Sequence, residues 1–141
     1  MKKLIARFAS HPKQLFLFDS MGGLLSATVP LFILWQFESQ FGLPRELLIA
    51  MAVTGFLYGA YSLICALRIE SRWSFFLKIL VVANSAYLIS LLAYTVLHFS
   101  DLSHLGLAYL LVDHLVLISV IAIEISALAA ISKMWIPGTR S

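Results

Sequence analysis

The chain has 141 residues, 61% of them hydrophobic, and its mean hydropathy is +0.95. This composition excludes a soluble globular domain, and the length excludes more than one membrane domain. The formal net charge is +3, but the basic residues lie at the ends of apolar segments rather than in one patch, which excludes a nucleic-acid partner. One cysteine per chain excludes an intramolecular disulfide.

The first segment, residues 1–13, mixes basic and apolar residues before a proline-lysine pair. This pattern is typical of a short amphipathic segment on an anionic membrane surface. Arg7 interrupts the apolar run, and the next apolar stretch is as long as a membrane span. We therefore expect the N-terminus to be retained rather than cleaved as a signal peptide.

Four long apolar stretches follow, and we predict membrane-spanning helices at residues 14–37, 45–68, 73–99 and 104–133. Each is at least as long as the ~20 residues that cross the hydrocarbon at about 1.5 Å per residue. Pro30 is expected to kink the first of them. The connectors are short, and one carries the turn residues Gly42 and Pro44.

Short connectors favour neighbouring helices that run in opposite directions. The predicted fold is an all-α integral membrane protein with a four-helix up-down-up-down bundle. Residues 14–135 form its single transmembrane domain, and residues 136–141 form a polar C-terminal tail.

Orientation follows from the basic residues. In this topology nine of the ten Lys and Arg fall on one side of the membrane, and Arg45 alone falls on the other. Because Lys and Arg concentrate on the cytoplasmic side, both termini are predicted to be cytoplasmic. The predicted location is a bacterial inner membrane.

Two acids lie within the last span. Asp113 and Glu124 are eleven residues apart, which places them within ~20° of each other on a helix and about 16 Å apart along its axis. Ionisable groups at membrane depth are costly, so they normally face a bundle interior or a wet cavity. This shared face should therefore point toward the other helices.

Polar and small residues recur at helical spacing in every span, and their depths can be compared. Counted inward from Lys13, Arg68 and Lys78, respectively, Asp19, Ser62 and Asn84 all lie about 9 Å inside the cytoplasmic boundary, and Glu124 lies about 14 Å inside. Four helices can thus converge on one cluster. The predicted ligand-binding or ion-binding residues are Asp19, Glu124, Asn84, Tyr61, Ser62, Asp113 and Tyr87.

Two negative charges side by side at low dielectric require a proton or a bound cation. Two alternatives stay open for this cluster. Its hydrogen bonds would simply hold the helices together, or Lys78 would reach in and form a buried salt bridge.

Gly55 and Gly59 form a GxxxG spacing in the second span. Such a pair lets another helix approach closely, either within the monomer or across a dimer. They are the predicted oligomer contact if the protein forms a homo-oligomer.

Cofactor and metal signals are weak. His98 and His104 are predicted near the outer surface while His114 lies about two to three turns deeper than His104, so no opposed pair for haem exists at one depth. No cofactor is predicted. His98, Asp101 and His104 are candidates for a surface metal site, against the alternative of solvated loop side chains.

Enzyme signatures are absent as well. The chain has no HExxH, G-x-S-x-G or P-loop motif. Asp19 and Asp113 are predicted at different depths, which argues against an intramembrane aspartyl pair.

The favoured hypothesis is a small membrane protein that binds or transports a proton, a cation or a cationic small solute at its acids. Transport would require a homo-oligomer, because one short chain encloses little interior. The alternative is a non-catalytic accessory or sensor subunit that binds a partner membrane protein, a lipid or a quinone. A third hypothesis, a membrane enzyme, would need a substrate that reaches the acids from the cytoplasmic leaflet.

Overall fold

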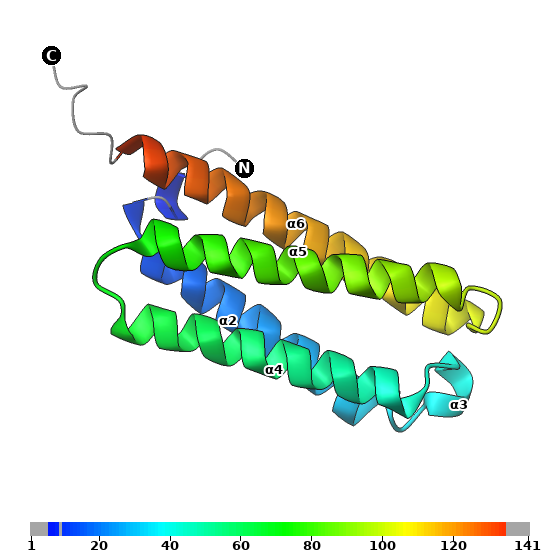
Figure 1. The fold of residues 1–141 in the computed structure, drawn as a ribbon. Coiled ribbons are helices and arrows are strands. Elements are labelled where there is room, and N and C mark those ends of the chain that lie inside the picture. The colour runs from blue at the N-terminus through cyan, green and yellow to red at the C-terminus, as the bar shows by residue number, and fades with distance from the viewer. Residues whose placement is uncertain (1–5, 9, 135–141) are drawn as a thin grey trace, which may run out of the picture.

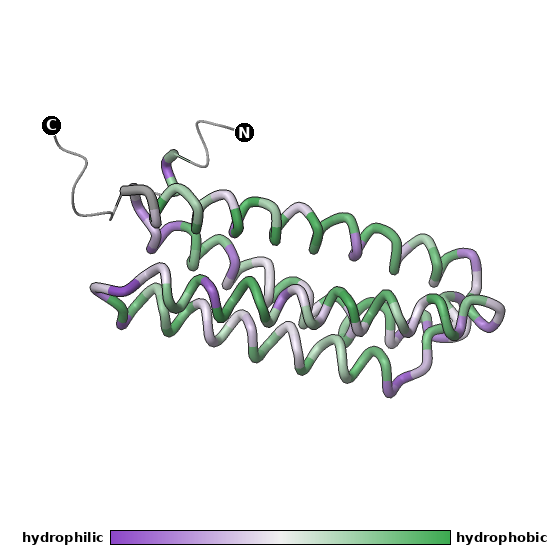
Figure 2. Tube along the Cα trace, turned by 45° about the horizontal axis from the view of Figure 1, so that its top comes forward, coloured by the Kyte–Doolittle hydropathy of each residue, from purple (hydrophilic) through white to green (hydrophobic). Residues whose placement is uncertain are grey.

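The computed structural model describes residues 6–8 and 10–134, and within them the chain is helical without strands. Four helical stretches are long and apolar enough to span a membrane: Pro12–Leu34, Arg45–Arg68, Trp73–Leu97 and His104–Ser132. By length and composition this is a membrane protein, as predicted. Figure 2 shows that the long helices are mostly hydrophobic, that the turns are hydrophilic, and that isolated hydrophilic positions interrupt the helices.

The first span combines α2 (Pro12–Thr28) with the π-helical turn η1 (Val29–Leu34). Pro30 lies inside η1, where the N–H of Trp35 donates to the Pro30 carbonyl over 3.1 Å. A proline ring crowds the preceding turn and lacks an N–H, so widening to the i→i+5 pattern relieves the helix locally. The span ends at Leu34, three residues before the predicted boundary.

The connector after this span was predicted as a loop, but it contains one helical turn, α3 (Glu38–Phe41). Gly42 ends that turn with φ of +62°, a conformation that glycine adopts without a Cβ penalty. The next helix, α4 (Arg45–Arg68), starts directly after Pro44, which is its N-cap residue.

The last two helices are α5 (Trp73–Leu97) and α6 (His104–Met134). Ser103 caps α6, because its Oγ accepts a hydrogen bond from the Gly106 N–H at 3.0 Å. The same hydroxyl donates to the Phe41 carbonyl at 2.5 Å and so ties α3 to α6. The α4–α5 loop and the α5–α6 loop lie at opposite ends of the bundle (Figure 1).

Glycines bring α2 and α4 into close contact. A Cβ added to Gly23 would lie 2.6 Å from the Gly59 nitrogen, and one added to Gly55 would lie 2.9 Å from the Gly23 carbonyl oxygen. Backbone therefore packs on backbone across this interface, the most extensive in the bundle. Of the two alternatives for the GxxxG pair, the structure uses it within the chain, and an oligomer contact through it stays untested.

Two apolar clusters form the core. The first joins eight buried residues near the α4–α5 loop: Phe8, Leu15, Phe16, Cys65, Ala66, Leu77, Leu80 and Ala127. The second joins six near the α5–α6 loop: Leu34, Leu43, Leu48, Met51, Leu91 and Leu110. Phe8 belongs to the first cluster, so this one side chain of the N-terminal segment packs on the bundle, while Arg7 and Ser10 beside it are exposed. Lys2, Lys3, Leu4 and Ile5 lie outside the described residues.

Candidate functional site

Between the two apolar clusters lies a polar layer with one side chain from each long helix. Ser62 of α4 donates a 2.5 Å hydrogen bond to Asp19 Oδ2 of α2, and Asn84 of α5 donates a 2.8 Å bond to Glu124 Oε1 of α6. The two pairs are adjacent, and the carboxyl groups of Asp19 and Glu124 are close enough to influence each other electrostatically. We call these four residues the acid cluster. The structure brings them together as the sequence predicted, while their role in binding stays a prediction.

The acid cluster is deeply buried. Glu124 is 0% exposed and Asp19 is 8% exposed, and Glu124 Oε2 has no hydrogen-bond partner among the described residues. Two neighbouring carboxylates repel each other at low dielectric, so a proton or a cation near Asp19 and Glu124 would stabilise the cluster.

Lys78 does not neutralise these acids. Its side chain is exposed, and the ion pairs of the described residues, Arg45–Glu38 and His98–Asp101, do not include it. A lysine near a helix end in this position extends toward the headgroups, which leaves the charged end in water. This geometry disfavours the alternative of a buried structural salt bridge with Lys78.

Beside the acid cluster lies a hollow of about 330 Å³, which we call the crevice. Its walls come mainly from α2 and α6, with single turns of α4 and α5 behind them. The lining residues are Phe18, Asp19, Met21, Gly22, Gly23, Leu25, Ser26, Gly55, Tyr58, Asn84, Tyr87, Asp113, Val116, Leu117 and Val120. Asp19 and Asn84 belong to both the crevice and the acid cluster, so the two are contiguous.

The crevice also contains two tyrosines and a second acid. The rings of Tyr58 and Tyr87 meet edge to face, with centroids 6.2 Å apart and an interplanar angle of 84°. Tyr58 donates to the Ala83 carbonyl at 3.1 Å, which fixes its ring against α5. Asp113 Oδ2 is buried and has no hydrogen-bond partner among the described residues. An acceptor left in this state can receive a donor from a ligand or a water.

Other predicted residues lie elsewhere. Tyr61 donates to the Phe76 carbonyl at 3.1 Å and does not line the crevice, so the structure does not bring it to the acid cluster. His114 is buried, and its Nδ1 donates to the Leu110 carbonyl of its own helix. Its Nε2 has no partner among the described residues. His114 is adjacent to Asp113 in sequence but does not line the crevice.

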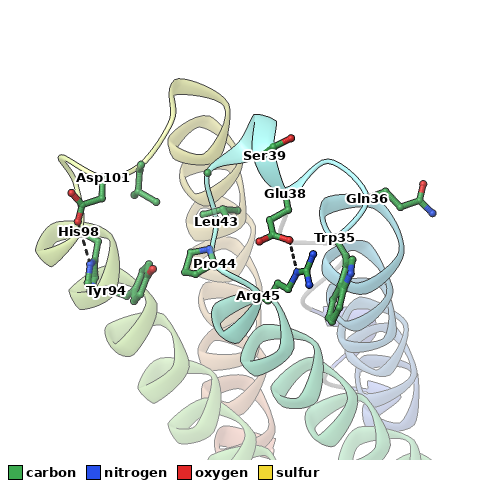
Figure 3. A pocket seen from close by; sticks show the side chains of 12 residues that line it. Trp35, Gln36, Glu38, Ser39, Leu43, Pro44, Arg45, Tyr94, His98 and Asp101 are labelled. Carbon is green, nitrogen blue, oxygen red and sulfur yellow. Dashed lines mark hydrogen bonds and ion pairs between the residues drawn. The ribbon is translucent and has the colours of Figure 1, made fainter.

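A second, larger hollow of about 740 Å³ lies at the end of the bundle near α3 (Figure 3). Its charged side chains are already paired. Arg45 binds Glu38 at 2.5 Å and stacks 5.3 Å above the Trp35 ring, and His98 faces Asp101 at 3.6 Å. This arrangement ties α4 to α3 and pairs the charged side chains of the hollow with one another.

The surface metal candidate does not assemble. His98 contacts Asp101, but His104 does not join them, and no three His, Cys, Asp or Glu side chains in the described part of the chain converge into a metal site. The physical reason is that His104 begins α6 on an exposed face, beyond the loop that carries Asp101.

Sequence reasoning did not select Tyr58, Phe18 or Gly22 as site residues. A sequence signal was present for Tyr58 and Gly22. Tyr58 lies four residues before Ser62, and Gly22 lies three residues after Asp19, so both fall on the polar faces of their helices. Phe18 directly precedes Asp19, and only the placement of α2 across the crevice from α6 shows that it is a lining residue.

Comparisons with known proteins do not add a function. No family model matches the chain, and neither the curated proteins nor the solved structures that were compared contain a match. The acid cluster and the crevice are therefore the features of the molecule that point to a function.

Proposed function

We propose that this protein binds a proton or a cation between Asp19 and Glu124 and exchanges it across a bacterial inner membrane. In this proposal the four spans form an up-down-up-down bundle with both termini in the cytoplasm. The acid cluster then lies in the cytoplasmic half of the bilayer, about 9 to 14 Å from its boundary.

The observation that carries the proposal is the unmet acceptor at the centre of the bundle. Glu124 is fully buried, its Oε2 lacks a partner among the described residues, and its neighbour is a second carboxyl group. A purely structural cluster normally satisfies every buried polar atom, since each unmet one costs about 1–3 kcal/mol. A bound proton or cation supplies what is missing.

The two apolar clusters limit how a bound ion could cross the membrane. They close the bundle on either side of the polar layer, so exchange across the membrane requires either helix movement or a path along a subunit boundary. A homo-oligomer would supply the second of these routes and is part of the proposal.

A second candidate function is an accessory or sensor subunit that binds a lipid or a quinone. The crevice favours this second function in one respect. Asn84, Tyr58 and Tyr87 offer polar groups in a mostly apolar hollow. A neutral ligand would hydrogen bond there without engaging a charge.

Chemical labelling of Glu124 tests the main proposal. A buried carboxyl that holds a proton at pH 7 should react with an apolar carbodiimide, and a bound cation should protect it from that reaction. Glu124→Gln keeps the side-chain shape and a hydrogen-bonding group, so it should fold while losing both the labelling and any proton flux in liposomes.

Lys78→Gln is the matched control, because Lys78 is charged but exposed and should not influence the labelling. Infrared spectroscopy gives an independent readout of the protonated carboxyl. An unfolded Glu124→Gln variant, together with a spectrum that lacks a protonated-carboxyl band at pH 7, would show a structural cluster instead.

Orientation can be tested separately. Reporter fusions at residues 70 and 141 should be cytoplasmic, and fusions at residues 42 and 101 should lie outside. Residue 42 and residue 141 on one side would contradict the proposed topology.

A further inference from the structure

The crevice is open on the side that faces lipid. Four residues at its edge have large exposed fractions: Phe18 50%, Met21 66%, Leu25 63% and Val116 53%. These residues belong to α2 and α6, while the two apolar clusters fill the core toward both ends of the bundle. A molecule can therefore reach the crevice sideways from the bilayer, between α2 and α6.

The charges of the crevice are all of one sign. Its lining includes the carboxyl groups of Asp19 and Asp113 and no Lys, Arg or His. Asp113 Oδ2 is buried without a partner in the described part of the chain. A carboxylate in an apolar hollow is strongly stabilised by a positive charge, so the complementary ligand is a cation.

The crevice also limits the shape of that cation. Tyr58, Tyr87 and Phe18 contribute aromatic rings, which attract organic cations. Along α6 the lining runs from Asp113 to Val120, seven residues or about 10 Å, and most of that length is apolar. Its volume of about 330 Å³ lies at the lower end of the ~300–1,000 Å³ typical of small-molecule sites.

We propose that the crevice binds a small organic monocation with an apolar body, taken laterally from the lipid, with Asp113 as its counter-ion. The inference rests on the proposed function and names the class of cation. The charged group lies at Asp113 and the tyrosines, and the apolar body extends along α6 toward Asp19. Contact with Asp19 couples occupancy of the crevice to the proton at the acid cluster.

The test uses a fluorescent styrylpyridinium dye, which is a monocation with an apolar aromatic body. The full chain is placed in nanodiscs of neutral phosphatidylcholine, and dye anisotropy is measured against protein concentration. We expect saturable binding that Asp113→Asn weakens at least tenfold. Asp101→Asn is the matched control, because it removes one acid from an exposed loop outside the crevice and should leave binding unchanged.

A second variant keeps the inference falsifiable if Asp113→Asn fails to fold. Gly22 lines the crevice, and a Cβ added there meets nothing within 4 Å. Gly22→Leu should therefore fold, reduce the free volume and weaken dye binding at least tenfold. Wild-type affinity in both variants would overturn the inference.

An uncharged dimethylaminostilbene of similar shape separates a cation site from a neutral one. Binding of this molecule as tight as that of the dye would overturn the inference and favour a lipid or quinone ligand. If inorganic cations protect Glu124 from carbodiimide but the dye does not bind, the inference about the crevice fails and the proposed function stands. If the dye binds at Asp113 but Glu124 labelling ignores all cations, the crevice site stands and the proposed function fails.

Discussion

The two interfaces of α2 differ in how closely the helices approach. Against α4, Gly23 meets Gly55 and Gly59, and backbone contacts backbone without a gap. Against α6, the side chains of Phe18 and Val116 stand at the edge of a hollow of about 330 Å³. Small residues close one side of the helix, and large residues around buried acids leave the other side open. The same helix thus provides both the closely packed support and one wall of the proposed binding site.

The largest expected effect comes from breaking the closed interface. Gly23→Ala would place its Cβ 2.6 Å from the Gly59 nitrogen and 2.8 Å from the Gly55 carbonyl oxygen. Neither backbone atom can move cheaply, so we expect a loss of about 3 kcal/mol in the free energy of unfolding. Titration with sodium dodecyl sulfate from mild detergent micelles measures this change.

Gly22→Ala is the neighbouring control. Its Cβ would meet nothing within 4 Å, and alanine is the better helix former. Stability should stay equal or rise slightly. Equal losses in the two variants would mean that the α2–α4 interface is not formed as described here.

The next largest effect concerns the hydrogen bond between α5 and α6 at the acid cluster. Asn84→Ala removes the donor of the 2.8 Å bond to Glu124 Oε1 and leaves a second oxygen of that buried carboxyl unmet. The expected loss in unfolding free energy is about 1–3 kcal/mol. Combined with Glu124→Gln, the two changes should be non-additive, because the residues are in contact.

Strict additivity of these two changes would contradict the contact between Asn84 and Glu124. Ser90→Ala provides the background value. Ser90 is exposed and bonds only to a carbonyl of its own helix, so its loss should be small.

The smallest expected loss of stability comes from two tyrosines of α4 that contact α5. Tyr58→Phe and Tyr61→Phe each remove one hydrogen bond to the α5 backbone, at 3.1 Å in both cases. Each should lose about 0.6 kcal/mol, the mean for such bonds in a membrane. Only Tyr58 lines the crevice, so only Tyr58→Phe should alter binding of the styrylpyridinium dye. A larger effect of Tyr61→Phe on dye binding would indicate that the dye binds outside the crevice.

The sequence by itself determined the number of apolar helices and the relative level of several polar residues along them. Bilayer thickness and helix rise act along one axis, so counting inward from Lys13, Arg68 and Lys78 was enough to place Asp19, Ser62 and Asn84 at one level. The Ser62–Asp19 hydrogen bond agrees with that count, whereas Asn84 bonds to Glu124, which the count places about 5 Å deeper. Helix ends were less certain, as the π-helical turn at Pro30 and the short helix α3 show.

Only the tertiary structure decided which faces meet. The rotation of each helix about its axis depends on packing against all the others, so spacing alone could not tell whether Gly55 and Gly59 contact α2 or a second copy. For the same reason it could not show that Lys78 is exposed, that Tyr61 turns to Phe76, or that Asp113 faces a hollow. A crevice is a gap left by side chains from four helices, and it exists only once all four are in place.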